Sequence, residues 1–242
     1  MTLSEPEIGA LIATLSRVGG LVATSPVIGD FGISVRARLV FVVAIVAAIG
    51  PVHPPVPLAD VAEIAIIELG VGLLTGLTAR FVMARAAIAG QLFGLSLGLG
   101  FASQYDIHAG ESAGTLRQIV TCIAGLAFLA AGGLEAIVQS AAAGPAQPHQ
   151  LALLGSLLLE QGASAFGHGL ALAAPVVLAA LVANIALALV SRAVPAANVF
   201  SIALGAVLII GGAALLDGAG EIIARISQDA QEAIRIMVGD AA

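Results

Sequence analysis

The 242-residue chain is 60% hydrophobic and only 10% charged, and its mean hydropathy is +1.09. An ordinary soluble domain is about 25% charged, so this composition supplies no polar coat for a water-soluble globule. The nine basic residues are all arginine and stand against 15 acidic ones, for a net charge of −6. This balance excludes a large basic surface for nucleic acid, and the missing lysine amine excludes a Walker-A phosphate loop and a lysine Schiff base. We expect a membrane protein.

Apolar stretches, separated by loops, organise the chain. A membrane-spanning helix needs about 20 residues, so two stretches are too short to cross alone. A third contains Pro175, which favours a kink or break. Residues rich in Pro, Gly and Asp predict loops at 50–60, 103–114 and 143–150. Hydropathy therefore predicts a polytopic membrane protein with about six crossings and some broken or re-entrant pieces. The stretches lie at 8–28, 39–52, 61–79, 86–102, 119–138, 151–159, 163–190 and 199–216.

Small residues dominate these stretches. The chain has 51 Ala and 29 Gly, no Trp and a single Tyr. Small residues let membrane helices approach closely, whereas aromatic belts mark helices that face lipid. Much of the surface is therefore expected to meet other helices. Glycines at helical spacing predict contact faces for helix packing or subunit interfaces, with the partner helix in this chain or in a neighbour; they are Gly72 and Gly76, and Gly90, Gly94 and Gly98.

Charged residues inside apolar stretches need a partner, a cavity or the membrane edge, because an unpaired charge in hydrocarbon costs several kcal/mol. Arg17 and Glu63 lie near enough to an edge to predict snorkelling to the interface. Glu68 lies deeper and is the better candidate for a buried polar contact.

The most polar internal stretch runs from Tyr105 to Arg117. It is either a solvated turn or a loop at membrane depth that lines or blocks an aqueous path, since irregular backbone is tolerated there only beside water or protein. Near the C-terminus, apolar residues recur at helical spacing and charged ones lie on the other faces. This pattern predicts an amphipathic helix over 218–242, packed on a neighbour or on the bilayer surface, at the end of one domain over 1–242.

No pattern points to catalysis. The four histidines are scattered without metal-ligand spacing, and no paired carboxylates or G-x-S-x-G nucleophile elbow occurs. Cys122 is the single cysteine, so no internal disulfide can form, and its apolar surroundings predict a buried side chain. We expect no enzyme, no metal and no cofactor.

Several motifs extend over essentially the whole chain. They are an early Arg-Pro-Gly set, the basic pair Arg36 and Arg38, a glycine-rich run at 70–76, the stretch AGQLFGLSLGLGFASQYD at 89–106, and a late R-x-x-P-x-x-N-V-F. Together they resemble the FliR family of type III export-gate subunits, whose virulence counterpart is SctT. The residues that carry the first and last motifs are Arg17, Pro26 and Gly29, and Arg192, Pro195, Asn198, Val199 and Phe200.

The sequence departs from the family pattern at a few positions. Ala196 replaces a Gln, and a G-x-P-x-K element keeps only Gly205, with Val207 and Ile209 at the other two positions. Leu134 replaces a histidine, and Ser34 replaces the proline expected before Arg36.

The resemblance implies an all-α, polytopic fold with broken, hairpin-like helices. It also implies a subunit of a helical export gate formed with FliP and FliQ, in contact with FlhB and near FlhA, in the bacterial inner membrane at the flagellar basal body. Its cargo would be unfolded flagellar proteins. The family's channel plug maps onto the loop after the glycine-rich helix, with Tyr105, Asp106, Ile107, His108, Glu111 and Arg117.

Two other functions stay open at this point. The first is a gate subunit of a virulence secretion system. The second is a small-solute transporter, in which Pro175 and the broken apolar stretches would form substrate-binding helices. A membrane protease or transferase is disfavoured by the missing catalytic pairs.

Overall fold

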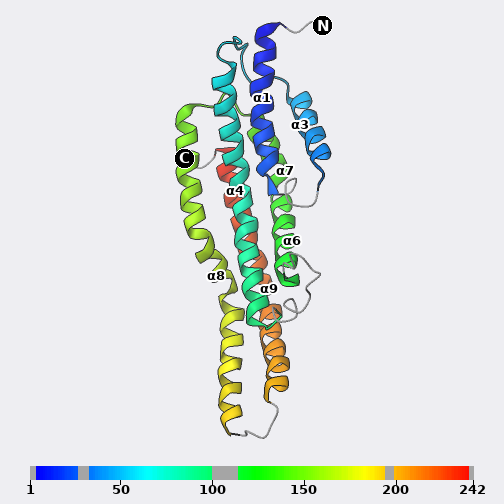
Figure 1. The fold of residues 1–242 in the computed structure, drawn as a ribbon, viewed down its shortest axis with the longest axis vertical. Coiled ribbons are helices and arrows are strands. Elements are labelled where there is room, and N and C mark those ends of the chain that lie inside the picture. Colours follow the sequence, from blue (N-terminus) through cyan, green and yellow to red (C-terminus); the bar gives the residue numbers. More distant parts are fainter. Residues whose placement is uncertain (1–3, 27–32, 100–113, 194–198, 240–242) are drawn as a thin grey trace. The chain divides into compact units, whose positions relative to one another are not determined.

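The computed structural model describes residues 4–26, 33–99, 114–193 and 199–239, with the side chains of residues 199–202 and 204 left out. Within these ranges the chain forms helices and no strand, which confirms the all-α prediction (Figure 1). The helices are α1 (Glu5–Thr24), α3 (Val35–Ile49), α4 (Val61–Ser96), α6 (Thr115–Ala130), α7 (Gly133–Ala142), α8 (Pro148–Ala193) and α9 (Val199–Val238).

Local sequence signals set the helix ends. At the start of α1, the backbone N–H of Ser4 donates to the carboxylate of Glu7 at 2.7 Å, which satisfies a donor that the helix leaves free. Ser34 caps α3, and Gly50, with φ of +76°, ends it before Pro51. The predicted loops at 50–60 and 143–150 therefore agree with the structure to within a few residues.

Glycines with positive φ interrupt the helices at two further points. Gly98, with φ of +74°, follows the end of α4, where the backbone N–H of Leu99 donates to the carbonyl of Gly94 at 3.0 Å. Gly132, with φ of +93°, separates α6 from α7. Only glycine adopts this conformation at little cost, so the glycine at each position accounts for the break. By length and composition the α6–α7 pair is a broken span or a re-entrant loop, which agrees with the broken pieces predicted for part of the chain.

The predicted number of crossings was too high. By length and composition, four helices in the described ranges can cross a membrane, or up to five if the α6–α7 pair is one span. Stretches 61–79 and 86–102 share one helix, α4, and stretches 151–159 and 163–190 share α8, which continues through Pro175. The residues between the stretches include Arg80, Arg85 and Glu160, which lower the local hydropathy but are good helix formers, so the helix continues. The predicted C-terminal helix is likewise part of α9.

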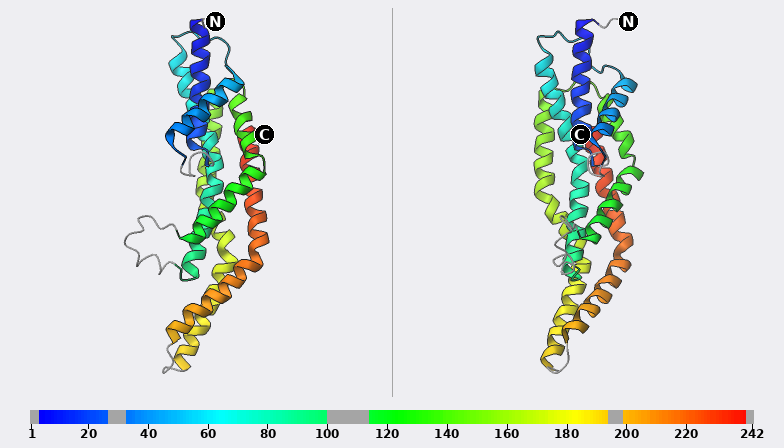
Figure 2. Two further views of the ribbon diagram at one scale, coloured as in Figure 1. Left: turned by 90° about the vertical axis from the view of Figure 1, so that its right-hand side faces the viewer. Right: turned by 45° about the vertical axis from the view of Figure 1, so that its right-hand side comes forward.

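The described chain divides into two compact units. Unit 1 comprises residues 1–82, 128–163 and 229–242. In it α1 packs against α3 and α7, and Figure 2 shows α3 beside α1 in both views. The loop after α3 is tied to α1, since Val52 N–H donates to the Thr14 hydroxyl at 3.0 Å and Val56 N–H donates to the Pro6 carbonyl at 2.9 Å.

Unit 2 comprises residues 83–127 and 164–228. Phe93 is fully buried, and Ala180, Ala183 and Val207 form a small core between α8 and α9. Within this unit the last part of α8 and the first part of α9 lie side by side as a hairpin (Figure 2). Cys122 is exposed, so the prediction of a buried thiol was wrong. An apolar run carries residues on both faces of its helix, and this one lies on the outer face.

Candidate functional site

A buried polar cluster of Arg17, His53 and Glu68 lies inside unit 1. Arg17 comes from α1, Glu68 from α4, and His53 from the loop that joins α3 to α4. The side chains are 5%, 1% and 6% exposed for Arg17, Glu68 and His53. The Arg17 Nε donates to Glu68 Oε2, and His53 Nε2 lies 2.5 Å from Glu68 Oε1.

The same cluster holds the loop between α7 and α8. Arg17 donates through Nη1 to the carbonyl of Ala143 and through Nη2 to that of Gly144, the latter at 2.9 Å. The backbone N–H of Ala146 donates to Glu68 Oε1 at 2.8 Å. Because Ala143 is the C-cap residue of α7, the guanidinium lies at the C-terminal end of this helix, where a positive charge is favourable, and it also holds the loop residue Gly144.

The cluster is suited to holding separate parts of the chain in position. Glu68 accepts from three donors and Arg17 donates to three acceptors, so these groups join four segments of the chain to one another. A charge buried at this depth is tolerated only with such partners, and removing one partner leaves the other exposed to the full desolvation cost. These contacts hold the α3–α4 loop and the α7–α8 loop against α1 and α4.

The sequence predicted this cluster only in part. The buried polar contact expected at Glu68 is confirmed. The snorkelling predicted for Arg17 was wrong, because its acceptors are supplied by segments 51 to 127 positions away in the chain. His53 was missed, and nothing in the Pro-rich sequence around it distinguishes a buried histidine from an exposed one.

Glycines allow α1 and the first part of α4 to touch through their backbones (Figure 1). A Cβ atom added at Gly20 would lie 2.7 Å from the Leu69 carbonyl oxygen. A Cβ at Gly76 would lie 2.7 Å from the Leu21 carbonyl oxygen, and one at Gly72 would overlap the Arg17 carbonyl. The close approach predicted for Gly72 and Gly76 is thus made inside the chain, next to the buried polar cluster.

The three glycines of the second predicted contact face lie in three different surroundings. A Cβ at Gly90 would lie 2.5 Å from the Cα of Arg117, so this glycine packs against α6 in unit 2. A Cβ at Gly94 would have no described atom within 4 Å. Gly98 lies beyond the end of α4, where its positive φ serves the turn. These three glycines therefore do not form one continuous contact face within the described chain.

The predicted plug residues fall mostly outside the described ranges. Arg117 is described and lies in the first turn of α6, so the polar stretch passes into a helix by Thr115. The helix begins there because Gly and Asp, which favour loops, are missing from the residues directly after Gly114. Tyr105, Asp106, Ile107, His108 and Glu111 lie outside the described residues.

Comparison with known proteins decides the family. The family described as bacterial export proteins, family 1, matches residues 8–233. The flagellar biosynthetic protein FliR of Caulobacter vibrioides is 31% identical over 210 residues, which cover 81% of this chain and 82% of that protein. The Escherichia coli FliR is 29% identical over 206 residues, 81% and 79% of the two chains, and the Aquifex aeolicus FliR is 28% identical over 215 residues, 83% and 81%. This chain belongs to the FliR family.

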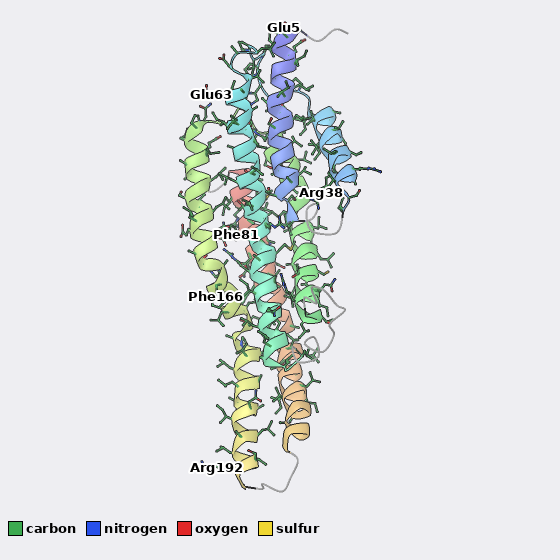
Figure 3. The ribbon with its side chains drawn as sticks, viewed as in Figure 1. Glu5, Arg38, Glu63, Phe81, Phe166 and Arg192 are labelled. Atoms are coloured by element: carbon green, nitrogen blue, oxygen red, sulfur yellow. The ribbon has the colours of Figure 1, made fainter. Side chains whose placement is uncertain are left out.

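The FliR-family motif residues are only partly described. Arg17 belongs to the buried polar cluster, and Pro26 is fully buried just after the end of α1. Arg192 lies exposed at the end of α8 (Figure 3). Phe200 belongs to α9 without a described side chain, and Gly29, Pro195 and Asn198 lie outside the described ranges.

Proposed function

We propose that this FliR-family chain is a non-enzymatic subunit of the flagellar type III export gate. In this proposal it assembles with FliP and FliQ, contacts FlhB, lies near FlhA, and forms part of the path by which unfolded flagellar proteins cross the inner membrane at the basal body. Family membership over residues 8–233 supports the function. The length of the apolar helices supports the assembly.

Helix α8 carries the argument for protein neighbours. Its 46 residues correspond to a helix of about 69 Å, whereas the hydrocarbon core of a bilayer is about 30 Å thick. Large apolar side chains are exposed from Leu153 to Val190, which is about 55 Å of that length. This length along the helix is nearly twice the hydrocarbon thickness, so lipid tails leave part of a straight helix uncovered at the usual tilts of up to about 40°. Other protein surfaces are expected to cover the rest, as in a gate built from several subunits.

The alternatives receive less support. A transporter with substrate-binding broken helices predicts an interruption at Pro175, but α8 continues through this residue. A virulence secretion subunit has no specific support either, because the relatives given above are flagellar proteins.

Deleting the gene and restoring it with an affinity-tagged copy tests the proposal. We expect the deletion strain to stop exporting filament proteins into the medium and the tagged chain to restore export. Purification of the tagged chain should bring FliP, FliQ and FlhB with it. A monomer in mild detergent that shows saturable solute uptake by itself would overturn the proposal.

Deleting residues 105–111 tests the proposed plug. If these residues close the channel, their loss should raise the ion conductance of the membrane while the complex still assembles. The measurement is the growth inhibition and membrane depolarisation of cells that express the deletion. Shortening the loop at 145–147 by one residue is not a suitable control, since Ala146 contacts Glu68. Removing the C-terminal residues 240–242 serves instead, and equal conductance in both strains would contradict the plug.

Substitution of Gly94 tests whether this glycine packs against a neighbouring subunit. Because no described atom lies near its Cβ position, Gly94→Leu should leave the amount of chain unchanged. At a subunit interface, however, the leucine would prevent close packing and remove FliP and FliQ from the purified complex. Gly90→Leu is the contrast, since its side chain meets Arg117 within the chain and should lower the amount of chain itself. Normal co-purification with Gly94→Leu would exclude an interface there.

A further inference from the structure

A cleft of about 490 Å³ opens in unit 2 between α4, the first turn of α6 and α8. This volume lies within the range of about 300–1,000 Å³ that is usual for sites of small molecules. Its polar side chains are Gln91 and Arg117. Its apolar walls are Ala84, Ala87, Ile88, Leu92 and Phe166.

The polar and apolar groups lie at opposite ends of the cleft. The close contact between Gly90 and the Arg117 backbone places Arg117 level with Gln91. Ala84 lies two helical turns earlier on α4, about 10 Å away. Gly169 packs against Ile88, and α4 and α8 run in the same direction here (Figure 1), so Phe166 lies toward the Ala84 end. The cleft therefore has a cationic end and a hydrocarbon-like end.

Neither the cationic end nor the apolar end of the cleft is covered by a partner among the described residues. The Arg117 side chain is exposed, and among the described residues no carboxylate or other acceptor pairs with its guanidinium. Phe166 is 62% exposed although it lines an apolar wall (Figure 3). A guanidinium prefers an anion with paired oxygens, such as a phosphate, and the apolar wall prefers hydrocarbon.

These preferences distinguish the possible occupants. A soluble phosphate compound would leave the apolar end in contact with water. An apolar helix of a protein neighbour would cover Phe166 but bury the guanidinium of Arg117 without an acceptor. A phospholipid supplies the phosphate and the hydrocarbon together, at the separation that the cleft requires, and it is the most abundant amphiphile around a membrane protein.

We infer that this cleft binds one anionic phospholipid, with its phosphate on Arg117 and Gln91 and an acyl chain along α4 toward Phe166. The site is independent of the proposed role in export. Headgroup selectivity comes from charge: an anionic lipid such as phosphatidylglycerol keeps a net negative charge beside Arg117, whereas phosphatidylcholine carries its own cation.

The absence of tryptophan from the chain allows a direct test. Phe166→Trp places a fluorophore in the cleft, and phospholipids with brominated acyl chains quench it on contact. The full chain is purified with whatever subunits accompany it, and the emission of the same complex with Phe166 is subtracted. Leu178→Trp, on an exposed part of α8 outside the cleft, reports ordinary contact with bulk lipid.

We expect half-quenching of Phe166→Trp at a concentration of brominated phosphatidylglycerol about five- to tenfold lower than that of brominated phosphatidylcholine. Leu178→Trp should show no preference. Arg117→Gln should abolish the preference at position 166, whereas Arg117→Lys should keep most of it because the charge remains.

Two results would overturn the inference. Equal quenching by the two lipids at Phe166→Trp would show bulk contact without a site. No quenching by either lipid there, with normal quenching of Leu178→Trp, would show that a protein neighbour covers the cleft. If Arg117→Gln lowers the yield of the complex, the comparison of Phe166→Trp with Leu178→Trp still decides between a selective site and bulk lipid.

Discussion

Replacing Glu68 with alanine should remove most of the chain from the membrane and abolish motility. The substitution leaves the Arg17 guanidinium buried without its anion, and it also removes the acceptor for His53 and for the N–H of Ala146. Breaking a buried ion pair from one side costs about 3–5 kcal/mol, a large share of the stability of a typical domain. The measurements are the amount of tagged chain in isolated membranes and swimming in soft agar.

Two further variants separate this explanation from a general effect of changing α4. Glu63→Ala alters an exposed glutamate near the start of the same helix (Figure 3) and should leave both readouts within experimental scatter. Arg17→Leu combined with Glu68→Leu removes both charges and should restore part of the chain level, because two apolar residues of similar volume need no ionic partner. If Glu68→Ala accumulates as well as Glu63→Ala, the cluster does not stabilise the fold.

The buried polar cluster also shows what the sequence could predict. A glutamate deep in an apolar stretch must have a partner, and this reasoning identified Glu68 correctly. It could not identify the partner, since Arg17 precedes Glu68 by 51 positions and the carbonyls that Arg17 contacts come more than 120 positions later. The position of Arg17 near the end of an apolar stretch therefore led to a wrong prediction of its surroundings. Tertiary packing decided between a buried and a snorkelling arginine.

Helix ends were predictable where backbone chemistry enforces them. Proline and glycine at 50–60 and 143–150 cannot continue a helix without cost, and α3, α4, α7 and α8 all end or begin there. Polar residues alone carry no such constraint. Arg80 and Arg85 lowered the local hydropathy and divided the apolar stretches 61–79 and 86–102, but arginine favours helix and α4 continues through both.

Glycine spacing likewise predicted that helices approach closely but not which helices. Gly72 and Gly76 approach α1, Gly90 approaches α6, and a Cβ atom at Gly94 would meet no described neighbour within 4 Å. The motif is the same in each case, because the absence of a side chain permits a contact without specifying the partner. The difference between these positions gives a second prediction with a large effect.

Adjacent glycines on α1 provide a matched pair for that prediction. Gly20→Ala places a Cβ atom 2.7 Å from the Leu69 carbonyl oxygen and 2.9 Å from the Leu73 nitrogen, and both obstacles are backbone atoms that cannot rotate away. Helix α1 must then move away from α4, which costs about 1–3 kcal/mol and strains the buried polar cluster one turn earlier at Arg17. At Gly19, no described atom lies within 4 Å of the Cβ position.

We therefore expect opposite effects from the same chemical change. Gly20→Ala should lower the thermal denaturation midpoint of the purified chain or complex by about 4 °C or more. Gly19→Ala should leave the midpoint unchanged or raise it slightly, since alanine favours helix over glycine by about 1 kcal/mol. Gly72→Ala, on the opposite side of the contact, should resemble Gly20→Ala because its Cβ would overlap the Arg17 carbonyl. Equal midpoints for Gly19→Ala and Gly20→Ala would mean that α1 and α4 do not meet through their backbones, and the placement of Arg17 beside Glu68 would lose its structural basis.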